Sequence, residues 1–188
     1  MIINRKNDFI MKRTLLTTIM AIAATFIFAA NPLTIIKGDK KFLKTANGGA
    51  LLEFIYDGAT YDDRMPLNEK FPDIDKLKKL SWDGFVEEFN ERCKTVKVVT
   101  KAEEAKYKFT VKVTKIDQFF NVMGFIPGPC VRAWGTLTVS DLKSGDVFLV
   151  LDIDEIDGGS NPSPDGAYSD CFEELGKLFV RQKYKDNH

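Results

Sequence analysis

Ala105-Lys-Tyr-Lys-Phe-Thr-Val-Lys-Val-Thr-Lys115 is the stretch that decides the fold. Within it, Tyr107, Phe109, Val111 and Val113 alternate with lysine and threonine. An alternation of period two places one face of a strand on a core and the other in water. The stretch therefore predicts a half-buried β-strand.

Four other segments have the composition of strands: residues 50–57, 96–100, 131–140 and 146–156. Asp141-Leu-Lys-Ser-Gly145 lies between the last two and predicts a hairpin loop that contains glycine. Residues 58–72, which follow the predicted strand at 50–57, are polar and contain Met65-Pro66 and Phe71-Pro72, which favours a loop. Residues 31–49 predict a leader with at most one short strand.

Two segments predict amphipathic helices. Asp73 follows a proline and is a typical cap residue, so we expect a helix to begin there. Gly84 weakens its middle, and the apolar stripe shifts near Ser81, which favours a kink or a second helix from that point. The second helix lies near the C-terminus, and its apolar stripe consists of Tyr168, Cys171, Phe172, Leu175, Leu178 and Phe179.

The element order is therefore β-α-β-β-β-β-α. Consecutive strands joined by short loops favour antiparallel neighbours. We expect an α+β fold over residues 50–188, a two-layer sandwich in one domain. Its mostly antiparallel sheet has about five strands, with the two amphipathic helices on one face.

This order, the 105–115 stretch and Leu137-Thr-Val-Ser-Asp-Leu-Lys-Ser-Gly-Asp-Val147 resemble a family of bacterial envelope α/β domains. The family includes the TolB N-terminal domain, curli-secretion lipoproteins and penicillin-binding-protein activators. The resemblance covers about 130 residues at the level of the fold. It implies binding of an envelope protein partner without catalysis, and it implies no catalytic residues.

The N-terminal segment predicts export. Arg5, Lys6, Lys12 and Arg13 precede an uncharged apolar run that ends in small residues at Ala30, the pattern of a signal peptide over residues 1–30. A retained membrane anchor is the alternative, because the run reaches the lower limit for spanning a bilayer. Either form places the protein in the periplasm or envelope of a Gram-negative-type bacterium.

Charge and residue content exclude several function classes. The net charge is +0, and the protein without residues 1–30 has a net charge of −3, which does not favour nucleic acid. The only histidine is the terminal His188, so histidine-based nucleophilic catalysis lacks its base. No zinc spacing, phosphate-binding loop or dinucleotide motif is present, and we expect no metal and no cofactor.

Carboxylates are the remaining route to catalysis. Asp152 and Asp154 lie near the end of a predicted strand, and Asp57, Asp62 and Asp63 follow another. Two such groups that converged in a cleft would suit hydrolysis. The alternation around Asp152 and Asp154 instead predicts that both face water.

Cys93, Cys130 and Cys171 leave two alternatives open. In an oxidising compartment, one disulfide, such as Cys130 with Cys171, would leave one thiol over. Otherwise all three are small buried hydrophobes.

The connection 119–130 between two strands is unusually apolar. Its large apolar residues are Phe119, Phe120, Val122, Met123, Phe125 and Ile126, and Trp134 follows in the next strand. An exposed apolar tip of this kind would dock on a protein groove, a lipid surface or a ligand. The alternatives are that the loop folds back and caps the core, or that the strands extend further and bury half of it.

The sequence therefore favours a non-catalytic exported protein that serves as a protein-interaction or assembly module. A small secreted hydrolase with paired carboxylates and a binder of an apolar small molecule are the alternatives.

Overall fold

The computed structural model describes residues 31–39, 41–122 and 127–184, and from Pro32 onward these residues belong to one compact unit, Pro32–His188. The predicted signal peptide lies outside the described residues. None of the described helices is long and apolar enough to cross a membrane.

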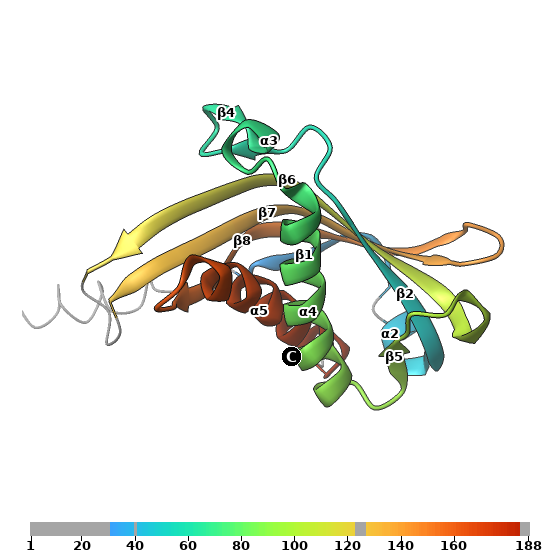
Figure 1. The fold of residues 1–188 in the computed structure, drawn as a ribbon. Helices are drawn as coiled ribbons and strands as arrows, with labels where there is room; N and C mark the ends of the chain where they lie inside the picture. The colour runs from blue at the N-terminus through green and yellow to red at the C-terminus, as the bar shows by residue number, and fades with distance from the viewer. Residues whose placement is uncertain (1–30, 40, 123–126, 185–188) are drawn as a thin grey trace, which may run out of the picture. The chain divides into compact units, whose positions relative to one another are not determined.

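The fold is built on a mixed sheet in the order β1-β8-β7-β6-β2-β5, with β3 attached to β6 and β4 attached to β3 (Figure 1). The strands are β1 Leu33–Gly38, β2 Gly48–Ile55, β3 Thr60–Tyr61, β4 Met65–Pro66, β5 Val96–Val98, β6 Ala105–Asn121, β7 Gly128–Asp141 and β8 Val147–Ser160. Strands β1, β8, β7 and β6 are antiparallel neighbours, whereas β2 is parallel to β5 and β6. The expected two-layer α+β architecture is therefore present in outline.

The sheet has eight strands, so the prediction of about five was too low. The segment predicted as a leader contributes β1, which pairs with β8 along the edge of the sheet. The segment predicted as a loop contributes β3 and β4, two strands of two residues each that form a small hairpin. Strands this short have no recognisable alternation, because period two needs at least four residues to be seen.

The two long helices, α4 Ile74–Arg92 and α5 Pro164–Tyr184, lie on one face of the sheet, which we call the inner face; the opposite face is the outer face (Figure 1). The shorter helices are α2 Lys41–Thr45, α3 Leu67–Lys70 beside the β3–β4 hairpin, and a 3₁₀ helix at Ala102–Glu104. The Asp73 carboxylate accepts a hydrogen bond from the backbone N–H of Lys76, which confirms the predicted N-cap.

Helix α4 is continuous, so the alternative of a second helix from Ser81 is wrong. Ser81 is buried, and its hydroxyl donates to the Leu77 carbonyl one turn earlier. Gly84 is required by the helix crossing, since a Cβ there would lie 2.2 Å from the backbone oxygen of Ser169 in α5. The stripe shifts because α4 packs on α5 as well as on the sheet.

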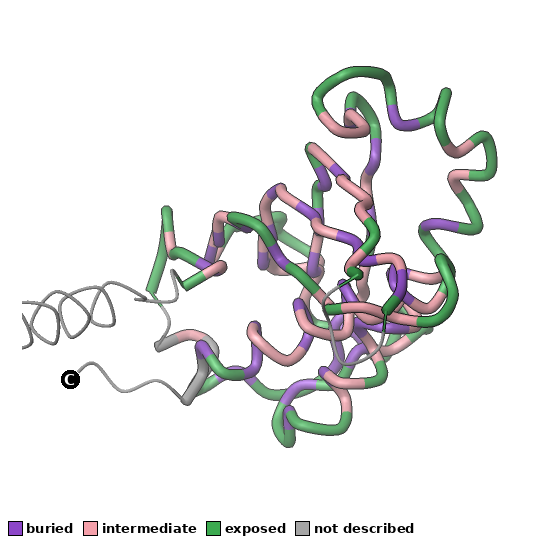
Figure 2. Tube along the Cα trace, turned by 90° about the vertical axis from the view of Figure 1, so that its left-hand side faces the viewer, coloured by how far each residue is buried: buried purple, intermediate pink, exposed green. Residues whose placement is uncertain are grey.

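The core confirms the alternation predicted for the strands. Phe109, Val111 and Val113 are buried on the inner face of β6, and Leu149 and Leu151 are buried in β8. Buried and less buried positions alternate along the strands (Figure 2). The predicted hairpin loop is also present, with the Asp141 carboxylate accepting from the backbone N–H groups of residues 143 and 144.

Candidate interaction surface

The apolar connection predicted at 119–130 is mostly strand. Strand β6 continues to Asn121 and β7 begins at Gly128, and the two pair in register as far as those residues. A connecting loop over 119–130 was therefore wrong at both ends, and the alternative of longer strands describes residues 119–121 and 128–130. We call residues 117–122 and 128–132 the distal end of β6–β7.

Side chains on the inner face become progressively exposed toward this end. Ile116 is 0% exposed, Gln118 is half-buried and Phe120 is 63% exposed. Val122, just after β6, is 73% exposed. The strand thus extends past the helices that cover it, and two apolar side chains of the predicted tip lie in solvent. Met123, Phe125 and Ile126 lie outside the described residues.

On the outer face, the distal end carries a cluster of aromatic and cationic side chains. The guanidinium carbon of Arg132 lies 4.5 Å from the centre of the Phe119 ring and 5.7 Å from that of the Trp134 ring. The ammonium group of Lys115 lies 4.4 Å from the centre of the Trp134 ring. These distances are within the range of cation–π interactions. We call Phe119, Arg132, Trp134 and Lys115 the outer-face stack.

Strand register builds this stack. Lys115 is opposite Trp134, and Phe119 is opposite Cys130, the position two residues before Arg132. An irregularity in register between Val113 and Lys115 reverses the alternation of β6, because a bulge adds one residue to one strand. Phe119 therefore reaches the outer face beside Arg132.

Carboxylates hold the cations in place. Arg132 pairs with Asp117 on β6 and with Glu155 on β8, the latter at 3.1 Å, and Lys115 pairs with Asp63. Burial opposes the charge of Arg132, but its hydrogen bonds to Asp117 and Glu155 outweigh burial and raise the pKa of the guanidinium. Glu155, which forms this ion pair, has a φ of 58°, in the left-handed region that side chains other than glycine rarely adopt.

The sequence identified Phe119 and Trp134 but missed Arg132, Lys115 and Asp117. These three have ordinary positions in alternating strands and become a cluster only once the register of β6 against β7 is known. The arrangement offers apolar ring surface and paired charges. The outer-face stack suits contact with a partner, because its charges are already balanced by opposite charges beside them and the ring surface can be covered without leaving a charge unpaired.

The two groups of carboxylates considered for hydrolysis lie on different strands. Asp152 is on β8, whereas Asp62 follows β3, and β7 and β6 separate these two strands. Three strand spacings amount to about 14 Å, which exceeds the separation of roughly 5–9.5 Å in glycosidases. Asp154 is exposed and Asp152 is half-buried between buried Leu151 and Ile153, which confirms the predicted alternation. Among the described residues, no cluster of histidine, cysteine and carboxylate side chains could hold a metal ion.

The three cysteines are buried free thiols. Cys171 lies in the core between sheet and helices and donates to the carbonyl of Ile156, whereas Cys130 lies outside that core cluster. The disulfide between Cys130 and Cys171 is therefore not formed. The alternative of three small buried hydrophobes describes them.

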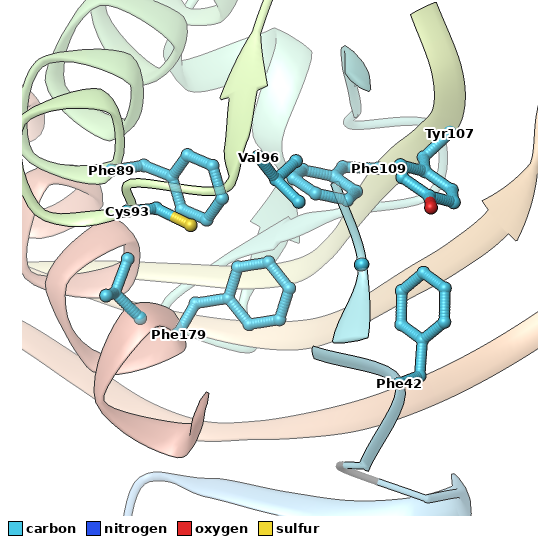
Figure 3. A pocket seen from close by; sticks show the side chains of 9 residues that line it. Phe42, Phe89, Cys93, Val96, Tyr107, Phe109 and Phe179 are labelled. Atoms are coloured by element: carbon cyan, nitrogen blue, oxygen red, sulfur yellow. The ribbon is translucent and has the colours of Figure 1, made fainter. Parts of the chain in front are cut away.

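An apolar pocket lies between α2, α4, α5 and the strands β5 and β6 (Figure 3). Its volume is about 10 Å³, and Phe42, Phe89, Phe109 and Phe179 are among the residues that line it. Small-molecule sites typically need about 300–1,000 Å³, so this pocket is too small for the predicted apolar ligand.

A more open groove of about 360 Å³ lies beside the end of β2. It is lined by Tyr56, Asp57, Gly58, Ala59, Thr60, Pro66, Asn68 and Ile74.

No protein-family model matches the sequence. No curated protein is significantly similar to it.

Several solved structures are similar to the chain. The PelC dodecamer from Paraburkholderia phytofirmans is 11% identical, with a TM-score of 0.44 over 78% of this chain and 96% of that chain. Protein XCC0632 from Xanthomonas campestris, of family DUF330, is 10% identical, with a TM-score of 0.39 over 72% and 83%. A homologue of neuraminyllactose-binding hemagglutinin from Helicobacter pylori is 14% identical, with a TM-score of 0.29 over 79% and 87%. Likenesses at this level assign no function to the chain, since unrelated functions share folds. The resemblance to the TolB N-terminal and curli-secretion family stays a prediction.

Proposed function

We propose that the protein is a non-catalytic exported module that binds an envelope protein partner through the distal end of β6–β7. The observation that carries this proposal is the exposure of Phe120 and Val122 at the end of a strand pair. Exposed apolar side chains that are clustered mark interaction sites more often than isolated ones do. Export to the periplasm or envelope is the expectation from the N-terminal sequence.

The outer-face stack supports this role because its side chains at the distal end already contact one another. Phe119 is held by Arg132, which is in turn held by two carboxylates on neighbouring strands. A surface that is already ordered loses less conformational entropy when a partner binds. Aromatic and arginine side chains are also the residue types enriched at protein interfaces.

The test is site-specific photocrosslinking in the native cells. A photoreactive phenylalanine analogue replaces Phe120, and in a matched control it replaces Val147, which is 40% exposed at the opposite end of β7–β8. We expect a discrete protein adduct from position 120 and none from position 147. Equal adducts from both positions, or none from position 120, would contradict the proposal.

Loss of folding must not account for the result. The double variant Phe120→Ser, Val122→Ser changes exposed side chains only, so its free energy of unfolding should stay within about 0.5 kcal/mol of the wild-type value. Urea unfolding followed by tryptophan fluorescence measures this. A much larger loss would show that these side chains serve the core rather than a partner.

A further inference from the structure

Strand β6 has an edge that its neighbours leave open. On one side it pairs with β7 from Tyr107 to Asn121, and on the other it pairs with β2 and then with β3 at Lys115 and Ile116. Within the described part of the chain, no strand lies beside residues 117–120 on that second side. We call residues 117–120 the open edge. Such an edge presents backbone N–H and C=O groups that can pair with another chain.

Strands β1 and β5, at the two ends of the main strand order, carry the features that normally prevent such pairing. Strand β1 has a register irregularity at Ile36, followed by the exposed Lys37. Strand β5 is three residues long and has the exposed Lys97 at its centre. Bulges, short strands and lysines are the usual protections of an edge. The open edge contains no lysine, proline or register irregularity, and it exposes Phe120.

Strand β3 shows that this side of β6 accepts a parallel neighbour. It occupies the position beside Lys115 and Ile116 and then turns away at Asp62 and Asp63, both with φ near 53°. The backbone N–H of Asp62 still donates to the Ile116 carbonyl at 2.9 Å. The next position along the same side is the open edge.

We propose that the open edge receives an extended, uncharged segment of a partner polypeptide as an additional strand. This proposal rests on the proposed function and specifies its mode of binding. Strand addition to a sheet edge takes its affinity from main-chain hydrogen bonds and its specificity from alternate side chains. The segment places an apolar side chain against Phe120.

The charges around the open edge explain why the segment is uncharged. The charged side chains there are paired within the molecule: Asp62 with Arg64, Asp63 with Lys115, and Asp117 with Arg132. A charge on the incoming segment would lose hydration without gaining a partner. The edge therefore selects neutral segments.

The β3–β4 hairpin explains why the occupant is a single segment rather than a second copy of this chain. Strand β3 lies next to β6, and β4 lies beyond β3. The β6–β7 pair of a second copy would approach as two strands and meet both members of this hairpin. A single extended segment meets only β3.

A library of random heptapeptides displayed on phage tests the proposal against the full chain. Phage that bind the wild type are collected, and phage that also bind Phe120→Lys are removed. This variant adds a positive charge to the open edge at an exposed position. We expect enriched peptides that are uncharged and alternate apolar with polar residues. The matched control Val147→Lys should bind them like the wild type. The absence of enrichment over Phe120→Lys would overturn the proposal.

Backbone N-methylation of an enriched peptide separates strand addition from docking of side chains. Alternate N–H groups of an added strand point toward β6, so methylation of one alternating set should weaken binding at least tenfold. Methylation of the other set should leave binding within about twofold. If both sets bind equally, strand addition is wrong, although the photocrosslink at position 120 would still support the proposed function. A wild-type dimer that Phe120→Lys dissociates in sedimentation would also overturn the proposal, because the occupant would then be a second copy.

Discussion

The guanidinium group of Arg132 lies over the ring of Phe119, 4.5 Å from its centre, and is also paired with Asp117 and Glu155. One side chain thus joins β6, β7 and β8 on the outer face, where no described helix covers the sheet. These contacts of Arg132 stabilise the distal end of β6–β7, because the helices on the inner face do not extend to Phe120.

Replacement of Arg132 by Met should therefore destabilise the protein. It leaves Asp117 and Glu155 close together without a cation, and hydrogen bonds to charged groups contribute about 1.5–3 kcal/mol. We expect a loss of about 1–3 kcal/mol in the free energy of unfolding, measured with urea. The control is Lys112→Met, which lies on β6 on the same outer face of the sheet as Arg132. It should change the free energy of unfolding by less than about 0.5 kcal/mol. Equal effects would show that the Arg132 contacts contribute nothing specific.

A second prediction concerns Gly84→Ala, for which packing and helix propensity change the stability of the protein in opposite directions. Alanine favours a helix interior over glycine by about 1 kcal/mol. A Cβ at this position would, however, lie 2.2 Å from the backbone oxygen of Ser169, and both belong to helices that pack on each other. Overpacking costs about 1–3 kcal/mol, so Gly84→Ala should lower the melting temperature. The exposed Glu87→Ala on the same helix is the control, and a stabilised Gly84→Ala would contradict the close crossing.

The parts of the fold that the sequence predicted are those with a local signal. Phe109 and Val111 alternate with polar residues, Asp73 caps its helix, and Asp141 closes its hairpin. Each of these signals lies within a few residues of the chain. The candidate surface depends on long-range pairing, and its arrangement could not be predicted in the same way.

Thr114 illustrates the difference. It lies at the register irregularity of β6, which shifts the alternation by one residue between Val113 and Lys115. Alternation without interruption along β6 would place Phe119 on the inner face, whereas the structure places it on the outer face against Arg132. The sequence allowed one short strand in residues 31–49, but the place of β1 in the sheet was not predicted, because its pairing with β8 joins residues more than a hundred positions apart.

Tyr56 and Tyr168 offer a matched pair of hydroxyl groups for a third prediction. Both rings are buried, and burial raises the pKa of each phenol far above its usual range. The Tyr56 hydroxyl is hydrogen bonded to Ser81, whereas within the described part of the chain the Tyr168 hydroxyl has no partner. Tyr56→Phe should lower the free energy of unfolding by about 0.5–1.5 kcal/mol.

Tyr168→Phe should have the opposite sign. It removes a polar group whose burial costs free energy without a hydrogen bond in return, so we expect a neutral or stabilising change of up to about 1–3 kcal/mol. Thermal and urea unfolding of the two variants side by side measure the contrast. Equal destabilisation by both changes would mean that the Tyr168 hydroxyl does find a partner in solution.

Glu173 gives a prediction on pH dependence. Burial and the nearby carboxylates of Glu88, Asp170 and Glu87 raise its pKa in the folded protein, and Lys177 opposes them only partly. A carboxyl group with a raised folded pKa contributes stability below its unfolded pKa of about 4.3, and this contribution is lost as the pH rises through the folded pKa. At pH 7 the ionised Glu173 is therefore unfavourable. Glu173→Gln should raise the free energy of unfolding there by about 0.2–0.5 kcal/mol, the usual cost of a like-charge pair on a helix.

The gain from Glu173→Gln should disappear in acid. Near pH 4 and below, the wild-type carboxyl group is protonated in the folded protein and resembles the amide in charge. Urea unfolding at pH 7 and at pH 4 should show the difference at the higher pH only. Glu103→Gln, on the exposed 3₁₀ helix, is the control and should show no such dependence. A gain of equal size at both pH values would attribute the effect to packing of the amide rather than to the charge of Glu173.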